Sequence, residues 1–116
     1  MEPTVLNKDS FIQLVGNFSE ENWKFVGERP CIVDFFAPWC GYCKRLAPLF
    51  EEFAKEYDGR VNFYTVDVDQ EAELEAAFDI RTIPTLLTCK TSGEKNSMLG
   101  TLTKAELRKV IDSLLV

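Results

Sequence analysis

Residues 35–44 of the chain read Phe35-Phe36-Ala37-Pro38-Trp39-Cys40-Gly41-Tyr42-Cys43-Lys44. An apolar run typical of a strand ends at a Pro-Trp step, and two cysteines follow where a helix is expected to begin. Two thiols separated by two residues can close a small disulfide ring, so this pair can take up or release two electrons. The segment predicts a redox site between a strand and a helix.

Length and charge restrict what else the protein can be. The 116 residues suit one domain, residues 1–116, with a hydrophobic core of its own. With 13 Lys plus Arg against 19 Asp plus Glu, the net charge is −6, which argues against nucleic acid as a partner. The longest apolar runs are far shorter than the roughly 18 residues of a membrane span, so we expect no membrane insertion. We also expect a monomer.

The N-terminal residues lack the pattern of a secretory signal. This favours a cytoplasmic location, although a mature periplasmic form with its signal removed would look the same. The chain contains no histidine, which removes every Ser-His, Cys-His and His-metal arrangement. A zinc site would need about four ligands, and only one Cys-X-X-Cys pair is present. We therefore expect no metal and no cofactor beyond a disulfide between Cys40 and Cys43.

Hydrophobic periodicity predicts strands that alternate with helices and then a hairpin and a closing helix. We expect strands at residues 4–6, 31–36, 61–68, 85–89 and 97–99, and helices around residues 11–18, 19–26, 40–57, 71–78 and 103–115. The nearly continuous apolar run 31–36 favours a central strand covered on both faces. This order predicts the α/β class: a mixed central sheet flanked by helices on both faces.

The two cysteines of the pair are expected to differ in their roles. Cys40 would sit at the helix N-terminus, where backbone amides and the helix dipole favour a thiolate and lower its pKa. Cys43 would lie one turn further along, covered by the helix. We therefore expect exposed Cys40 to attack a substrate disulfide and Cys43 to resolve the mixed disulfide. Gly41 has no side chain to obstruct an approaching substrate.

Asp34 interrupts the apolar strand six residues before Cys40. A solvated carboxylate at a strand edge is one interpretation, but its apolar neighbours favour burial, which would raise its pKa and suit it to proton exchange with a thiol. Cys31 and Cys89 are interpreted as buried apolar residues, with a regulatory second disulfide as the alternative. Cys31 is an odd number of residues from Asp34, so it should face the other side of the sheet.

Three segments together resemble the thioredoxin family. The segment from Val33 to Lys44 is similar to its active site, Ala47-Pro48 to its kinked helix, and Arg81-Thr82-Ile83-Pro84-Thr85 to its second signature. The resemblance covers almost the whole chain. It implies the thioredoxin fold and an enzyme that reduces protein disulfides by dithiol exchange.

The resemblance also implies roles for individual residues. Pro84 would follow a cis peptide bond that places the backbone of Ile83 beside Cys40, ready to pair with an extended substrate. Cys40 would be the nucleophile and Asp34 the buried acid-base group. The substrate docking surface would comprise Trp39, Gly41, Tyr42, Thr82, Ile83, Pro84, Gly100 and Thr101. Expected partners are proteins with disulfides and either a thioredoxin reductase or a membrane dithiol donor.

The chain departs from the family pattern at several positions. Tyr42 and Thr82 stand where proline and glycine are usual, Thr65 stands where many thioredoxins have lysine, and residues 17–27 predict a helical insertion. The flanks, Ala37-Pro38 among them, resemble those of protein disulfide isomerase domains. A disulfide oxidase or isomerase outside the cytoplasm is therefore one alternative function, and a redox-inert binding module is another.

Overall fold

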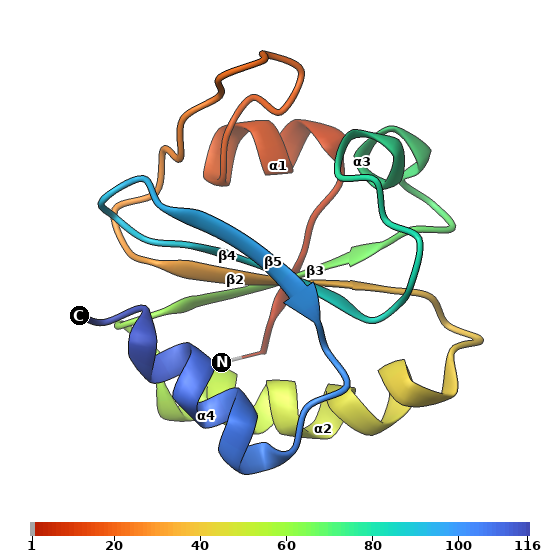
Figure 1. Ribbon diagram of the computed structural model, residues 1–116, viewed down its shortest axis with the longest axis vertical. Coiled ribbons are helices and arrows are strands. Elements are labelled where there is room, and N and C mark those ends of the chain that lie inside the picture. The colour runs from red at the N-terminus through yellow and green to blue at the C-terminus, as the bar shows by residue number, and fades with distance from the viewer. Residues whose placement is uncertain (1) are drawn as a thin grey trace.

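A five-stranded mixed sheet lies between two layers of helices in the computed structural model, which describes residues 2–116 (Figure 1). Helices α1 and α3 cover one face of the sheet, and α2 and α4 cover the other. In chain order the elements are β1 (Thr4–Val5), α1 (Lys8–Leu14), β2 (Cys31–Phe36), α2 (Gly41–Glu56), β3 (Asn62–Asp67), α3 (Ala72–Ala77), β4 (Thr85–Cys89), β5 (Lys95–Leu99) and α4 (Lys104–Ser113). The predicted α/β class, with helices on both faces, is confirmed.

The strand order is β1-β3-β2-β4-β5, which places β2 in the centre. Strand β3 runs parallel to β1 and β2, whereas β4 is antiparallel to β2 and forms the predicted hairpin with β5. Five of the six residues of β2 are buried, as expected for a strand covered on both faces. The carboxyl end of this central strand leads directly into the cysteine pair.

Side chains of β2 alternate between the two layers of helices. Val33 and Phe35 belong to the cluster that packs under α1 and α3, and Ile32 belongs to the cluster that packs under α2 and α4. Helix α2 contributes the predicted apolar stripe to the second cluster, with Leu46, Phe50, Phe53 and Ala54 all buried. Cys43, in the first turn of α2, belongs instead to the first cluster, together with Phe35 and Ala37 at the end of β2.

The predicted helical insertion at residues 17–27 is wrong, because this segment forms turns and irregular loop. The Asn17 side chain accepts hydrogen bonds from the backbone N–H and the hydroxyl of Ser19 at 3.3 and 2.6 Å, and it donates to Glu20 at 3.0 Å. Such local bonds offer the backbone an alternative to a helix. The aromatic residues of this segment instead anchor the loop: Phe18 and Trp23 pack on Phe11.

Candidate active site

The cysteine pair lies at the junction of β2 and α2. Cys40 is the N-cap of α2: its backbone is extended, and its Sγ accepts the N–H of Cys43 at 3.2 Å. The Cys40 N–H donates to the carbonyl of Ala37 at 3.2 Å, which fixes the turn after the strand. Unpaired amides and the helix dipole at this position stabilise negative charge on Cys40 Sγ. The geometry therefore favours a reactive thiolate at Cys40 when the pair is reduced.

Cys40 and Cys43 are joined as a disulfide, with their Cα atoms 5.2 Å apart. The expectation that Cys40 is exposed is wrong for this disulfide form, because Cys40 is 6% exposed and Cys43 is 4% exposed. The Cys40 sulfur lies 3.8 Å from the carbonyl oxygen of Ile83 in the neighbouring loop. The surroundings of the two sulfurs therefore distinguish the cysteines better than their exposure does.

The peptide bond between Ile83 and Pro84 is cis, as the resemblance implied. The Gly100 N–H donates to the Pro84 carbonyl at 2.8 Å. A Cβ added to Gly100 would lie 3.2 Å from the Pro84 ring and 3.3 Å from Leu46 Cδ2. A side chain at this position would be in tight contact with both, so glycine suits the close approach of these two loops to each other and to α2. Segments far apart in the sequence thus meet beside Cys40.

The remaining predicted docking residues surround the cysteines at the surface. Trp39 and Tyr42 are 70% and 56% exposed, and a Cβ on Gly41 would meet no atom within 4 Å. Thr82 and Thr101 are exposed as well. Large exposed aromatic side chains that precede and follow Cys40 in the chain offer a partner protein an apolar contact. Their role in docking remains a prediction.

Sequence reasoning missed the partner of Trp39. Its Nε1 donates to Asp69 Oδ2 at 3.0 Å, across 30 positions of sequence. Asp69 does not cap the helix that follows it, because α3 has Glu71 at its N-cap and no side-chain cap. A parallel pairing of β2 with β3 would have pointed to this bond, because it brings the residues that follow the two strands to the same edge of the sheet.

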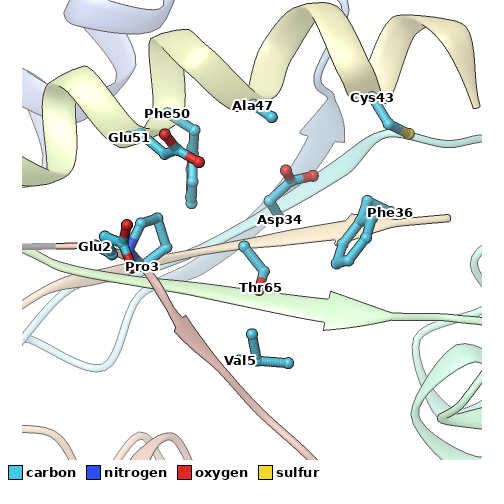
Figure 2. Close-up of a pocket in the computed structure, with 10 residues that line it drawn as sticks. All are labelled: Glu2, Pro3, Val5, Asp34, Phe36, Cys43, Ala47, Phe50, Glu51 and Thr65. Carbon is cyan, nitrogen blue, oxygen red and sulfur yellow. The ribbon is translucent and has the colours of Figure 1, made fainter. Parts of the chain in front are cut away.

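Asp34 is buried, as predicted, and lies beneath the cysteines on the α2 side of the sheet. Figure 2 shows its carboxyl group pointing from β2 towards α2, between Ala47 and Thr65. The residue is 3% exposed, and its Oδ1 has no hydrogen-bond partner among the residues that the structure describes. Burial raises the pKa of this carboxyl to about 7. Asp34 can thus exchange a proton near neutral pH.

A cavity of about 300 Å³ connects Asp34 with the second cysteine. It is lined by Glu2, Pro3, Val5, Asp34, Phe36, Cys43, Ala47, Phe50, Glu51 and Thr65. Because Asp34 and Cys43 line the same space and Asp34 Oδ1 is unpaired, water in it could carry a proton between them. Cys40 does not line this cavity.

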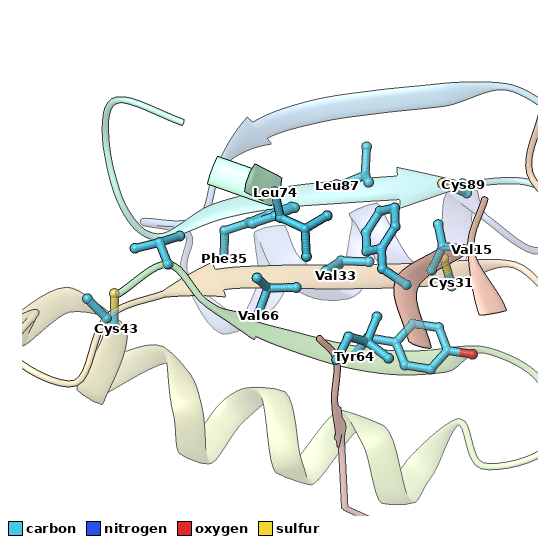
Figure 3. Packing of buried hydrophobic residues seen from close by; sticks show 14 of the residues in the cluster. Val15, Cys31, Val33, Phe35, Cys43, Tyr64, Val66, Leu74, Leu87 and Cys89 are labelled. Carbon is cyan, nitrogen blue, oxygen red and sulfur yellow. The ribbon is translucent and has the colours of Figure 1, made fainter. Parts of the chain in front are cut away.

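Cys31 and Cys89 stand directly opposite each other on the antiparallel strands β2 and β4. Both are fully buried and free, and they lie at the end of the sheet remote from Cys43 (Figure 3). The neighbouring Cys89 thiol, together with burial, raises the pKa of Cys31 above its ordinary value. Cys31 packs with Val33 and Phe35, on the face opposite Asp34, as predicted. The two thiols are therefore separate from the site.

Within residues 2–116, no helix is long and apolar enough to cross a membrane. The same residues contain no group of three or more Cys, Asp or Glu side chains that could hold a metal ion. The chemistry available at the site is that of the two sulfurs and the carboxyl below them. A dithiol that closes and reopens in this way exchanges two electrons with another dithiol or disulfide, which defines the class of thiol–disulfide exchange proteins.

Comparison with known proteins agrees with this chemistry. The Thioredoxin family model matches residues 4–113. The chain is 35% identical to the thioredoxin of Borreliella burgdorferi over 107 residues, which is 91% of this chain and 92% of that protein. It is 38% identical to the chloroplastic M-type thioredoxin of Spinacia oleracea over 90% of its own length and 59% of that relative. The chain belongs to the thioredoxin family, and it is a thiol–disulfide oxidoreductase.

Proposed function

We propose that this protein reduces disulfides in other proteins, with Cys40 as the attacking cysteine and Cys43 as the resolving cysteine. The observation that supports this most is the asymmetry of the pair. Cys40 Sγ accepts a hydrogen bond from a backbone N–H at the N-terminus of α2 and lies near the Ile83 carbonyl. Cys43, in contrast, lines the cavity that Asp34 also lines. One sulfur faces the substrate side, and the other faces a proton acceptor.

In the first step the Cys40 thiolate attacks one sulfur of the substrate disulfide. A bond forms between Cys40 Sγ and that sulfur, the substrate S–S bond breaks, and the other substrate sulfur leaves as a thiolate that takes a proton from water. The product is a mixed disulfide between Cys40 and the substrate. The backbone N–H of Cys43 donates a hydrogen bond to Cys40 Sγ, which stabilises the attacking thiolate before this step.

In the second step Cys43 gives its proton to the Asp34 carboxylate, through water in the shared cavity, and attacks Cys40 Sγ. The second substrate sulfur leaves as a thiolate, and the disulfide between Cys40 and Cys43 forms. The substrate has gained two electrons and the protein has lost two. A carboxyl whose pKa is about 7 is half ionised at neutral pH, so Asp34 can accept this proton and release it again.

The substrate would dock on the surface around the cysteines. Ile83 precedes the cis peptide bond, and its carbonyl faces Cys40 Sγ. We assign to its backbone the pairing with an extended substrate segment, while the exposed side chains of Trp39 and Tyr42 contact the apolar part of that segment. Thr82, Pro84, Gly100 and Thr101 complete this docking surface.

We propose that a thioredoxin reductase regenerates the dithiol, with a membrane dithiol donor as the alternative, and that the protein acts as a monomer in the cytoplasm. A mature periplasmic form is the alternative to the cytoplasmic location.

The experiment combines an insulin reduction assay with the redox potential of the Cys40–Cys43 pair in glutathione buffers. We expect insulin reduction and a potential near about −270 mV, the value known for thioredoxin itself. A potential near about −180 mV, the value known for protein disulfide isomerase, would contradict the reductase and favour the isomerase. Full function of a Cys40→Ser, Cys43→Ser double variant would favour a redox-inert binding module.

A further inference from the structure

A second groove opens beside the cysteines, on the opposite side of α2 from the Asp34 cavity. Its volume is about 270 Å³, and it is lined by Tyr42, Arg45, Leu46 and Leu49 of α2 and by residues 100–103. The α2 residues fall at helical spacing, so they form one stripe along the helix. Arg45 contributes the only charge among the lining residues, and none of them is acidic.

The Arg45 side chain is in contact with Tyr42 and has no ionic partner among residues 2–116. Its guanidinium carbon lies 4.4 Å from the centroid of the Tyr42 ring, a cation–π contact that limits the positions open to this long side chain. None of the ion pairs in residues 2–116 includes Arg45. What distinguishes Arg45 is its position in the lining of the groove, together with Tyr42 from between the two cysteines.

Two carboxylates on the neighbouring elements are already bound elsewhere. Glu52 pairs with Lys104 at 2.8 Å, and Glu106 accepts the backbone N–H of Thr103 at 2.9 Å in the capping box of α4. These contacts compensate charges at the start of α4 and leave Arg45 available. A carboxylate brought by another molecule would find a guanidinium in a groove with apolar walls, where planar bidentate pairing is favoured.

The groove continues directly from the site where the substrate disulfide reacts. Gly100, which lines the groove, is in contact with the Pro84 ring and Leu46 and donates its N–H to the Pro84 carbonyl. Tyr42 lies between the two cysteines in sequence and forms one wall. A substrate segment that runs along Ile83 and Pro84 therefore reaches the groove within a few residues of its reacting cysteine.

We propose that Arg45, held by Tyr42, forms a specificity subsite for an acidic side chain in the substrate, a few residues from the disulfide cysteine. The Asp or Glu carboxylate pairs with the Arg45 guanidinium, and the methylene groups of the substrate residue pack on Leu46 and Leu49. This inference rests on the proposed function, because it requires the substrate cysteine to react at Cys40. Arg45 does not take part in the chemical steps.

The test uses three peptides that contain the same disulfide and differ only in the residues within three positions of the cysteines, which are Glu, Gln or Lys. The reduced protein is mixed with each peptide, and kcat/KM for reduction is measured at low salt. We expect the ratio of kcat/KM for the Glu peptide to that for the Lys peptide to be about twofold to fivefold, the range of a single exposed ion pair. Because exposed charges are screened, about 0.5 M NaCl should reduce this ratio towards one.

Three variants separate a local contact from general attraction. Arg45→Glu should invert the ratio, and Arg45→Met, which keeps an apolar side chain at this position, should bring it close to one. Lys55→Glu introduces the same change of charge on the last turn of α2, away from the groove, and should keep the wild-type ratio. Each variant is compared as a ratio between peptides, so a general loss of activity does not affect the result.

An equal change of the ratio in Arg45→Glu and Lys55→Glu would overturn the inference, because it would show attraction by the net charge of the protein. A wild-type ratio of one would also overturn it, while leaving the proposed function intact as long as the Gln peptide is reduced. Failure of the wild-type protein to reduce any of the three peptides would contradict the proposed function itself, and the inference with it.

Discussion

Asp34 lies directly opposite Thr65 on the adjacent parallel strands β2 and β3, and both residues line the cavity that reaches Cys43. Burial alone raises the pKa of the Asp34 carboxyl to about 7. The resemblance to thioredoxins places a lysine where this chain has Thr65. With a hydroxyl there instead, no opposite charge next to the carboxyl offsets its burial.

A cation introduced at this position should lower the pKa of Asp34. In the wild-type protein the resolving step needs the Asp34 carboxylate, so its rate should rise with pH through an inflection near pH 7. In Thr65→Lys the ammonium group favours the carboxylate and should move this inflection down by about one pH unit or more. Thr65→Met, of similar length but uncharged, is the control. Stopped-flow measurement of single-turnover reduction against pH provides the test, and an unchanged inflection in Thr65→Lys would contradict the assignment.

Asp34 should also make stability depend on pH. Its folded pKa, about 7, is raised above the ordinary value of 3.8, so the folded state binds more protons between these values. The contribution of Asp34 to the free energy of unfolding is therefore largest below about pH 4, falls as pH rises to about 7, and is constant above. The full effect is on the order of 4 kcal/mol, since each pKa unit corresponds to about 1.4 kcal/mol.

Asp34→Asn should remove this dependence. The variant should match the wild type near pH 4 and be more stable by roughly 2–4 kcal/mol at pH 8, because the wild type then carries a buried charge. Urea denaturation at both pH values measures the difference. If the variant were equally or less stable at pH 8, the carboxyl would not be an unpaired buried charge.

A side chain at residue 100 should destabilise the protein. The Cβ of Gly100→Ala would lie 3.2 Å from the Pro84 ring and 3.3 Å from Leu46 Cδ2, so these neighbours would have to shift by a few tenths of an ångström. We expect the free energy of unfolding to fall by about 1–2 kcal/mol, as for other overpacked sites, and KM for a disulfide substrate to rise. Gly41→Ala is the matched control, because its Cβ would meet nothing within 4 Å. Equal stability of Gly100→Ala and the wild type would show that the loops are not closely packed.

The parts of the fold that follow from periodicity could be predicted from the sequence. The apolar run of β2 and the stripe of α2 specify a buried strand and an amphipathic helix by themselves. The burial of Asp34 followed from its apolar neighbours in the same strand. The cis bond at Pro84 was accessible only through resemblance, because nothing in the local residues distinguishes it from a trans bond.

The errors occurred where tertiary contacts or local side-chain bonds outweigh the pattern. Residues 17–27 have helical spacing, but Asn17 bonds to its own loop and the aromatic residues pack on Phe11. The bond from Trp39 to Asp69 and the contact of Arg45 with Tyr42 depend on how elements meet and on the choice of rotamer. The exposure of Cys40 was misjudged because the loop at Ile83, which comes from a distant part of the sequence, lies against its sulfur.

The central claim is that Cys40 attacks and Cys43 resolves, and the most direct test is to trap the mixed disulfide. Cys43→Ser and Cys40→Ser are each reduced, mixed with a protein disulfide substrate, quenched with acid and analysed by mass spectrometry after digestion. We predict that Cys43→Ser accumulates a mixed disulfide at Cys40, while Cys40→Ser accumulates none. Accumulation on Cys43 in the Cys40→Ser variant, with none on Cys40 in the Cys43→Ser variant, would contradict the account.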